Sequence, residues 1–340
     1  MNHPRRLPIE SFLAALPQGT CLDVRSPGEY AVGHLPGALS FPLFSDAERA
    51  EIGTAYKHIS VEKAFELGLL YTGPKMPGLV REARTLAAGK PLLVYCWRGG
   101  QRSAALAWLL SQAGLEVYVL EGGYKSWRNH AHQLLEQPYQ LRVLGGPTGS
   151  GKTDVLHALA AAGEQVVDLE ALAAHKGSAF GAIDMPTPPT QEHFINLLAD
   201  QLRRLDAKRP IWVEDESRMI GQLNIPAPFF KQMQQAPCIL LEVPMAMRLQ
   251  RLVADYGRAD QRQLRLAFEK IGRKLGGQHL KAALAFLEQG QLTEAATLAL
   301  RYYDRAYALD LEERAAERIV RWVVDHAEPA HIARQLLQIS

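Results

Sequence analysis

The stretch LLVYCWRGGQRS, residues 92–103, joins an apolar run of four residues to Cys96, two glycines and two arginines. A short apolar run before glycines predicts a buried strand, and a helical pattern begins at Ser103. The N–H groups of such a loop and the helix N-terminus stabilise a thiolate and can hold an approaching anion. Cys96 is therefore a candidate nucleophile, flanked by Arg98 and Arg102, and the alternative is a buried, inert cysteine.

The alternation of strand and helix recurs along the chain, which predicts an α/β fold with parallel sheets covered by helices. Further apolar runs lie at residues 21–24, 117–120, 141–144, 166–169, 211–213 and 238–243. The 340 residues are enough for two domains. We expect a first domain over 1–138 (core about 11–134), a second α/β domain over 139–245, and a wholly helical C-terminal extension over 246–340 packed on the second domain.

Composition limits the cellular location and the kinds of partner that we expect for the protein. The net charge is +2, no secretory signal opens the chain, and no apolar run approaches membrane-spanning length. The three cysteines, Cys21, Cys96 and Cys238, have neither a disulfide framework nor metal-ligand spacing. These features predict a cytoplasmic protein with no membrane partner and no resident metal site.

The segment GPTGSGKT, residues 146–153, matches the phosphate-binding P-loop between a predicted strand and a predicted helix. Glycines let successive N–H groups face phosphate oxygens, Lys152 neutralises terminal phosphates, and Thr153 can hold Mg²⁺. The pattern specifies a polyphosphate, not a nucleotide. The predicted phosphate-binding residues are Gly146, Gly149, Ser150, Gly151, Lys152 and Thr153.

A second apolar run, residues 211–213, ends in the acidic segment 214–216. Carboxylates at this position suit a group that holds a metal or activates water, as in Walker-B sites. Asp215 and Glu216 are the better candidates, and a solvated acidic turn is the alternative.

The segment from residue 248 to residue 281 is strongly basic, because it contains nine Lys or Arg residues and only three acidic residues. Such an excess in a nearly neutral chain could bind an RNA backbone, or could be a solvated helix face. The RNA-binding candidates are Arg248, Arg251, Arg258, Arg262, Arg273 and Lys274.

Asp23 and Arg25 follow the first predicted strand, immediately before a turn. They could pair and brace the cysteine loop, or they could be ordinary surface charges.

The first domain resembles a rhodanese. Residues 22–30 (LDVRSPGEY), 33–38 (GHLPGA), the Cys96 loop and 122–127 (GGYKSW) match that family's motifs in order. Rhodanese cysteines carry sulfur or selenium as a persulfide or its selenium analogue. Small rhodaneses commonly have four residues between Cys and Arg, whereas Cys96 and Arg102 enclose five. Five is also the spacing of Cys-dependent phosphatases, and the longer loop should fit a tetrahedral, phosphate-sized group.

A rhodanese domain followed by this P-loop resembles the tRNA 2-selenouridine synthase family. The resemblance extends to residues 52–57, 175–181, 213–221 and 302–304, and so covers nearly the whole chain. It implies replacement of sulfur by selenium in 2-thiouridine at the tRNA wobble position, number 34. Family members resembling this chain use geranyl diphosphate to make an S-geranylated intermediate, then displace that group with selenium from selenophosphate.

The resemblance also assigns roles to residues. Cys96 would carry selenium, Arg98 and Arg102 would hold the departing phosphate, and the P-loop would bind the diphosphate of the geranyl donor. Mg²⁺ is compatible with the P-loop; ATP remains an open alternative there, although the scheme does not require it. The basic helices would dock tRNA, and an enzyme that supplies selenophosphate is a further partner to consider.

Two other function classes stay open at this point. The first is a Cys-dependent phosphatase of rhodanese fold with a nucleotide-binding regulatory domain. The second is a small-molecule kinase, which would leave Cys96 without a role.

Overall fold

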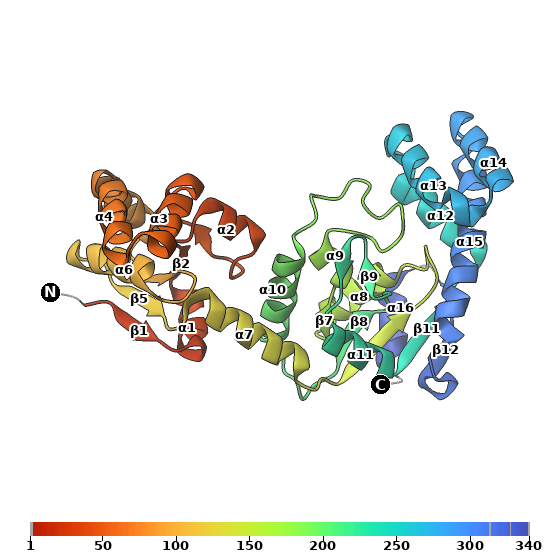
Figure 1. The fold of residues 1–340 in the computed structure, drawn as a ribbon. Coiled ribbons are helices and arrows are strands. Elements are labelled where there is room, and N and C mark those ends of the chain that lie inside the picture. The colour runs from red at the N-terminus through yellow and green to blue at the C-terminus, as the bar shows by residue number, and fades with distance from the viewer. Residues whose placement is uncertain (1–2, 313, 327, 339–340) are drawn as a thin grey trace. The chain divides into compact units, whose positions relative to one another are not determined.

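The computed structural model describes residues 3–312, 314–326 and 328–338. The chain divides into two compact units between Leu134 and Leu135, four residues before the boundary expected after residue 138. Each unit is an α/β domain with its own parallel sheet (Figure 1). The predicted fold class is therefore confirmed.

The first unit is built on a five-stranded parallel sheet of order β1-β5-β4-β2-β3. The central strand β4 is buried along its whole length, as expected for a parallel strand covered on both faces. The two short edge strands have largely exposed side chains, so no apolar pattern could reveal them. The strands are β1 (Arg5–Leu7), β2 (Thr20–Asp23), β3 (Leu39–Ser40), β4 (Leu92–Tyr95) and β5 (Val117–Leu120).

Helices of the first unit begin where the sequence supplies suitable caps. The Ser45 and Ser60 side chains accept N–H groups at the starts of α3 and α4, and Ser26 and Glu29 form a capping box at α2. The helices are α1 (Ile9–Ala15), α2 (Pro27–Val32), α3 (Asp46–His58), α4 (Val61–Thr72), α5 (Met76–Ala87), α6 (Gln101–Gln112) and α7 (Gly123–Glu136), with 3₁₀ turns η1 (Leu16–Gln18) and η2 (Gly73–Lys75).

The second unit has a five-stranded parallel sheet of order β12-β11-β6-β8-β7 and a small antiparallel pair, β9 and β10. Its strands are β6 (Leu141–Gly145), β7 (Gln165–Val167), β8 (Ile211–Glu214), β9 (Met219–Ile220), β10 (Leu223–Asn224), β11 (Cys238–Glu242) and β12 (Ile319–Val323).

The expectation that residues after 245 are wholly helical was wrong for β12. Ile319 to Val323 pair in parallel with Cys238 to Glu242, so the chain returns to complete the sheet. The segment IVRWV carries an arginine, and its edge position leaves most of its side chains partly or fully exposed. A strand with so little buried surface lacks a clear apolar period, which is why the sequence did not predict it.

Two groups of helices cover this sheet. Helices α10 and α11 share one core cluster with β6, β8 and β11, and helices α8 and α16 share another with the same strands. Helices α12 to α15 pack on one another, and Figure 1 shows the long α15 running from α13 and α14 towards β12. No helix within the described ranges is both long and apolar enough to cross a membrane. The helices are α8 (Lys152–Ala161), α9 (Leu169–Ala173), α10 (Gln191–Leu202), α11 (Ala227–Gln235), α12 (Met245–Tyr256), α13 (Gln261–Leu275), α14 (Gly277–Glu288), α15 (Leu292–Glu312), η3 (Ala316–Arg318) and α16 (Pro329–Leu337).

Candidate active site

Cys96 lies in the loop between β4 and α6, at the carboxyl edge of the first sheet. Its Sγ is 3.2 Å from the hydroxyl oxygen of Ser103, in the first turn of α6. The N–H of Tyr124 donates to the Cys96 carbonyl at 2.8 Å, which fastens the loop to the start of α7. A Cβ at Gly123 would lie 2.3 Å from that carbonyl oxygen, and Gly123 has φ +61°, so the contact requires glycine.

Asp23 and Arg25 form a buried ion pair that supports this loop. Both side chains are fully buried, and an Arg25 Nη2 to Asp23 Oδ2 distance of 2.6 Å defines an ion pair. The Arg25 guanidinium lies 3.8 Å from the centroid of the Tyr124 ring and 5.7 Å from that of Trp97. The structure therefore supports the interpretation that Asp23 and Arg25 pair and brace the cysteine loop, and neither is a surface charge.

The two arginines of the loop differ in their surroundings. Arg98 is exposed, whereas Arg102 Nη1 donates to Glu29 Oε2 at 2.6 Å. Burial acts to raise the pKa of Glu29, but the hydrogen bond and charge of Arg102 outweigh it and hold that pKa below its ordinary value. An anion that binds the Arg102 guanidinium would therefore share this group with the Glu29 carboxylate or displace that carboxylate from it.

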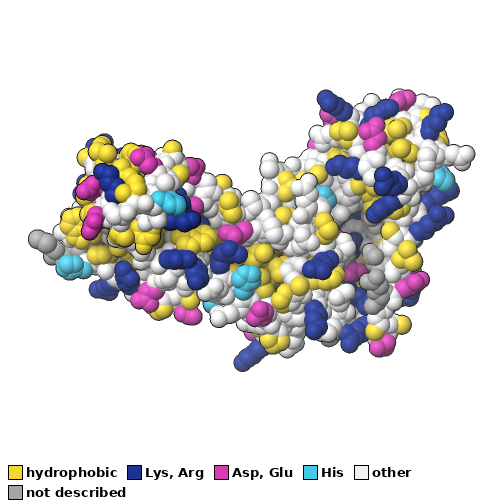
Figure 2. Space-filling model, viewed as in Figure 1, with side chains coloured by type: hydrophobic (Ala, Val, Ile, Leu, Met, Phe, Trp, Pro, Cys, Tyr) yellow, Lys and Arg dark blue, Asp and Glu magenta, His cyan; other side chains and the backbone are white. Residues whose placement is uncertain are grey.

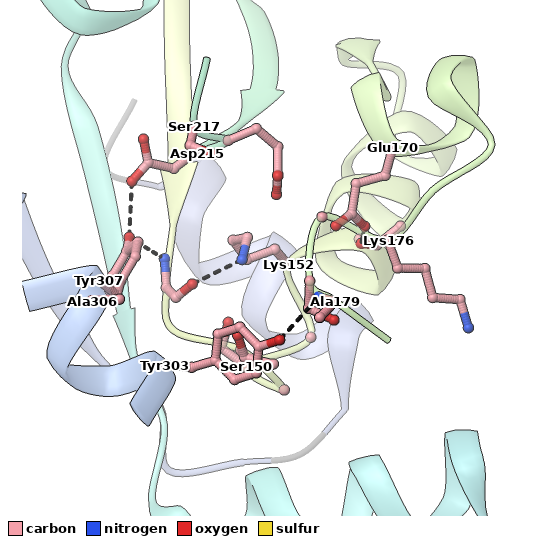
Figure 3. A pocket seen from close by; sticks show the side chains of 18 of the residues that line it. Ser150, Lys152, Glu170, Lys176, Ala179, Asp215, Ser217, Tyr303, Ala306 and Tyr307 are labelled. Carbon is pink, nitrogen blue, oxygen red and sulfur yellow. Dashed lines mark hydrogen bonds between the residues drawn. The ribbon is translucent and has the colours of Figure 1, made fainter. Parts of the chain in front are cut away.

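The P-loop of the second unit connects β6 to α8 (Figure 3). Lys152 Nζ donates to the Gly146 carbonyl at 2.8 Å, so the ammonium group lies over the loop. Gly151 has φ +79°, and a Cβ there would lie 2.2 Å from the Arg251 guanidinium. Ser150 Oγ is buried and has no hydrogen-bond partner among the described residues. A buried hydroxyl without a partner in this loop fits the binding of an anion.

Asp215 does not face the P-loop as a free carboxylate. One of its oxygens accepts from Tyr307 at 2.9 Å and the other from Arg314 at 2.8 Å. The Tyr307 hydroxyl in turn accepts the N–H of Gly146 at 2.8 Å. Asp215 and Tyr307 thus link α15 to the P-loop, and Asp215 also lines the cavity over this loop.

Glu216 has different partners. Burial and the charge of Glu170 raise its pKa to about 8. Thr153 Oγ1 donates to Glu170 Oε2 at 3.0 Å, so two carboxyl groups and a hydroxyl adjoin the P-loop. Sequence reasoning missed Glu170, because it lies in α9 with no motif linking it to Thr153.

These groups are the candidate ligands for the Mg²⁺ that is compatible with the P-loop. Within the ranges that the structure describes, no three His, Cys, Asp or Glu side chains form a metal site of their own. Thr153 offers a hydroxyl oxygen, and Glu170 and Glu216 offer hard carboxylate oxygens once a bound cation has displaced their protons. Mg²⁺ prefers such donors and usually completes its shell with water and substrate phosphates. The residues therefore fit Mg²⁺ bound together with a diphosphate.

A cavity of about 1040 Å³ opens over the P-loop. In the view of Figure 2, Lys and Arg side chains lie round a hollow in the second unit. The lining also includes the tyrosines Tyr256, Tyr302, Tyr303 and Tyr307. Its basic residues are Lys152, Lys176, Arg218, Arg251, Lys270, Lys274 and Arg314.

The predicted RNA-binding residues differ in their exposure and in their contacts. Arg258, Arg262, Arg273 and Lys274 are exposed, and Lys274 also lines the cavity. Arg251 lines the cavity and pairs with Asp154.

Arg248 was predicted as an RNA-binding residue, but the structure places it in the interior of the second unit. It is 4% exposed, its Nε donates to the Thr148 carbonyl at 2.9 Å, and it forms an ion pair with Asp304 at 2.6 Å. Because β11 leads directly into α12, the first turn of this helix faces the P-loop, and Arg248 holds the loop to α15 instead of facing solvent.

Comparisons with known proteins match both units. A model of the tRNA 2-selenouridine synthase AAA domain matches residues 137–328, and a rhodanese-like domain model matches residues 9–130. A tRNA 2-selenouridine synthase of Bdellovibrio bacteriovorus is 36% identical, with 86% of this chain and 89% of the relative covered. The chain belongs to the tRNA 2-selenouridine synthase family. A second family member, from Cupriavidus pinatubonensis, is 34% identical over 91% of this chain and 93% of its own.

Membership of this family accounts for both loops in one chain. The rhodanese match includes Cys96, and the match to the family's AAA domain includes the whole P-loop and the whole basic run 248–281. The predicted pairing of a rhodanese-like domain with a P-loop domain is thereby confirmed.

Proposed function

We propose that this chain converts 2-thiouridine at the wobble position of tRNA to 2-selenouridine, through an S-geranylated intermediate. One observation carries the proposal most: a sulfur nucleophile site and a separate diphosphate-type loop occur in the same chain. A phosphatase needs only the first of these and a kinase only the second. The names of the relatives support the product, and the geranylated intermediate is what the resemblance to this family implies.

The first step is assigned to the P-loop cavity. The thiocarbonyl sulfur of the base forms a bond to C1 of the geranyl group, the C1–O bond breaks, and diphosphate leaves with the electron pair while N3 loses its proton. Lys152, the loop N–H groups and Ser150 Oγ would bind the leaving diphosphate, which stabilises charge that grows in the transition state. Mg²⁺, when bound near Thr153, supplies further positive charge for the diphosphate.

The second step is assigned to Cys96, with selenophosphate as the selenium donor. The Cys96 thiolate attacks the phosphorus of selenophosphate, the P–Se bond breaks, and selenide leaves while the phosphoryl group stays on Sγ. The selenide then attacks C2 of the base, the C2–S bond breaks, and geranyl thiolate leaves. Alkylation makes the sulfur a better leaving group than sulfide. Water then hydrolyses the S–P bond on Cys96 and releases phosphate, so selenium keeps one oxidation state from donor to product. Arg98 and the loop N–H groups would hold the phosphate released from the donor.

The tRNA would reach these sites by its phosphate backbone and its anticodon loop. The exposed Arg258, Arg262 and Arg273 can contact phosphates, which supply most non-specific affinity. A wobble base in a single-stranded loop can be turned out towards a protein pocket without breaking a base pair.

The test is incubation of the full chain with 2-thiouridine tRNA, geranyl diphosphate and selenophosphate, followed by mass spectrometry of the nucleosides. The proposal expects 2-selenouridine with all components, and S-geranyl-2-thiouridine when selenophosphate is omitted. Equal selenouridine formation without geranyl diphosphate would contradict the proposed intermediate. Release of phosphate from an aryl phosphate, with no change in the tRNA, would favour the phosphatase alternative.

A further inference from the structure

A second, small cavity lies beside the P-loop cavity and differs from it in chemistry. Its volume is about 40 Å³. Hydrocarbon side chains from four separate segments dominate its lining, notably Phe180, Leu252, Phe268, Leu292 and Ala296. We name this cavity the apolar slot. Among the side chains that the structure describes, no Lys, Arg, Asp or Glu lines it.

The apolar slot adjoins the cavity that holds the P-loop. Thr148 of the P-loop, together with Ser178, Tyr256 and Tyr303, lines both cavities. The Tyr303 hydroxyl accepts the N–H of Ala179 at 2.9 Å (Figure 3), so its polar end already has a partner. A ligand whose anionic end lies on the P-loop can therefore extend an uncharged chain past Thr148 into the slot.

We propose that the apolar slot binds the far end of the isoprenoid chain of the diphosphate donor and so selects its length. This inference rests on the proposed function and adds the subsite that recognises the chain. A P-loop beside a charged cavity would suit any polyphosphate. A hydrocarbon-lined extension of it suits an amphiphile whose one end is a diphosphate and whose other end is apolar.

The size of the slot limits the chain. One water-sized group takes roughly 10–15 Å³ measured in this way, so 40 Å³ admits about three such groups. The branched end of an isoprenoid has three carbons, which matches this room. Phe180 and Phe268 pack edge to face with centroids 4.9 Å apart, and both are buried in one core cluster. A donor with a further isoprene unit would have to displace these rings.

The first test fills the slot. Ala296 is half-buried in the lining, on α15, and Ala296→Phe would place a ring where the chain should lie. Ala308→Phe is the matched control, because Ala308 is exposed on the same helix and lines neither cavity. Binding of geranyl diphosphate and of inorganic diphosphate to the full chain is measured by calorimetry. For Ala296→Phe we expect affinity for geranyl diphosphate to fall at least about tenfold, the low end for lost apolar pocket contacts, with inorganic diphosphate unaffected.

The second test enlarges the slot. Phe268→Leu should raise the affinity for farnesyl diphosphate relative to geranyl diphosphate by about tenfold, and circular dichroism checks that the variant is folded. Equal wild-type affinities for geranyl and inorganic diphosphate, or unchanged geranyl diphosphate binding in Ala296→Phe, would overturn the slot. If wild-type protein geranylates tRNA while either result holds, the proposed function stands and only the subsite is wrong. If geranyl diphosphate binds through the slot but no tRNA is modified, the function fails and the slot remains.

Discussion

Replacing Arg248 should loosen the contact between the P-loop and α15 without weakening contacts to RNA. Arg248 makes three hydrogen bonds: one to the Thr148 carbonyl and two to the Asp304 carboxylate. The Arg248→Ala variant leaves both acceptors without this donor and removes the packing of the aliphatic stem. It thus tests whether this arginine is structural.

The expected cost follows from the burial of the two partners. Removing one member of a fully buried ion pair typically destabilises a protein by about 3–5 kcal/mol. The side chain of Arg248 is only 5% exposed, but that of Asp304 is 32% exposed, so water can partly solvate the abandoned carboxylate. We therefore expect a loss of about 2–3 kcal/mol in the free energy of unfolding of the second unit. The exposed Arg258→Ala should cost less than about 0.5 kcal/mol.

The assay is urea unfolding of the full chain, with hydrogen exchange of peptides from β11 and α15 reporting on the second unit. Arg248→Ala, Asp304→Ala and the double variant complete a cycle, in which the double variant should lose less than the sum of the single losses. If Arg248→Ala unfolds like the wild type while its tRNA binding loses salt dependence, Arg248 is an RNA contact and the structural assignment is refuted.

Three further predictions concern the RNA surface, the acidic pair and the cysteines. Arg273→Ala combined with Lys274→Ala should lower the slope of log tRNA affinity against log salt by roughly 0.7–0.9 per lost phosphate contact; an unchanged slope would exclude both residues from the RNA interface. The pKa of Glu216 is about 8 in the folded chain against an ordinary 4.5, so the folded state retains a proton that the unfolded chain loses between these values. Stability of the second unit should thus fall as pH rises from about 4.5 to about 8, and denaturation at several pH values should show a smaller fall for Glu216→Gln; an equal fall would contradict the assignment. Burial raises the pKa of Cys21, and raises that of Cys238 to about 12, so mass spectrometry of iodoacetamide-treated protein should find Cys96 modified first; earlier modification of either other cysteine would be the contrary result.

The sequence predicted those parts of the fold whose burial leaves a pattern. Strands β4 and β5 begin and end where their apolar runs do, because both are almost fully buried. Strands β1, β3 and β12 lie at sheet edges with many exposed side chains, and none was predicted. These three strands bury little apolar surface, so hydrophobic periodicity does not reveal them, whereas the edge strand β7 overlaps the predicted run 166–169.

The candidate site divides in the same way. The P-loop and the Cys96 loop were found because each is a contiguous motif whose spacing reflects its chemistry. Glu170, Tyr307 and Arg314 were missed, because tertiary packing alone brings them to the P-loop from separate elements. The basic run misled at Arg248, since counting charge cannot separate a buried ion pair from an exposed face.

The central claim is that the two loops perform successive steps on one nucleotide, and a crossed assay of two variants tests it most directly. Nucleosides from Cys96→Ala and Lys152→Ala reactions are identified by mass spectrometry, starting from 2-thiouridine tRNA and from tRNA that is already S-geranylated. We expect Cys96→Ala to accumulate the geranylated nucleoside from the first substrate. Lys152→Ala should leave the first substrate unchanged yet convert the second to 2-selenouridine. Selenouridine formation by Cys96→Ala, or normal geranylation by Lys152→Ala, would contradict this division of labour.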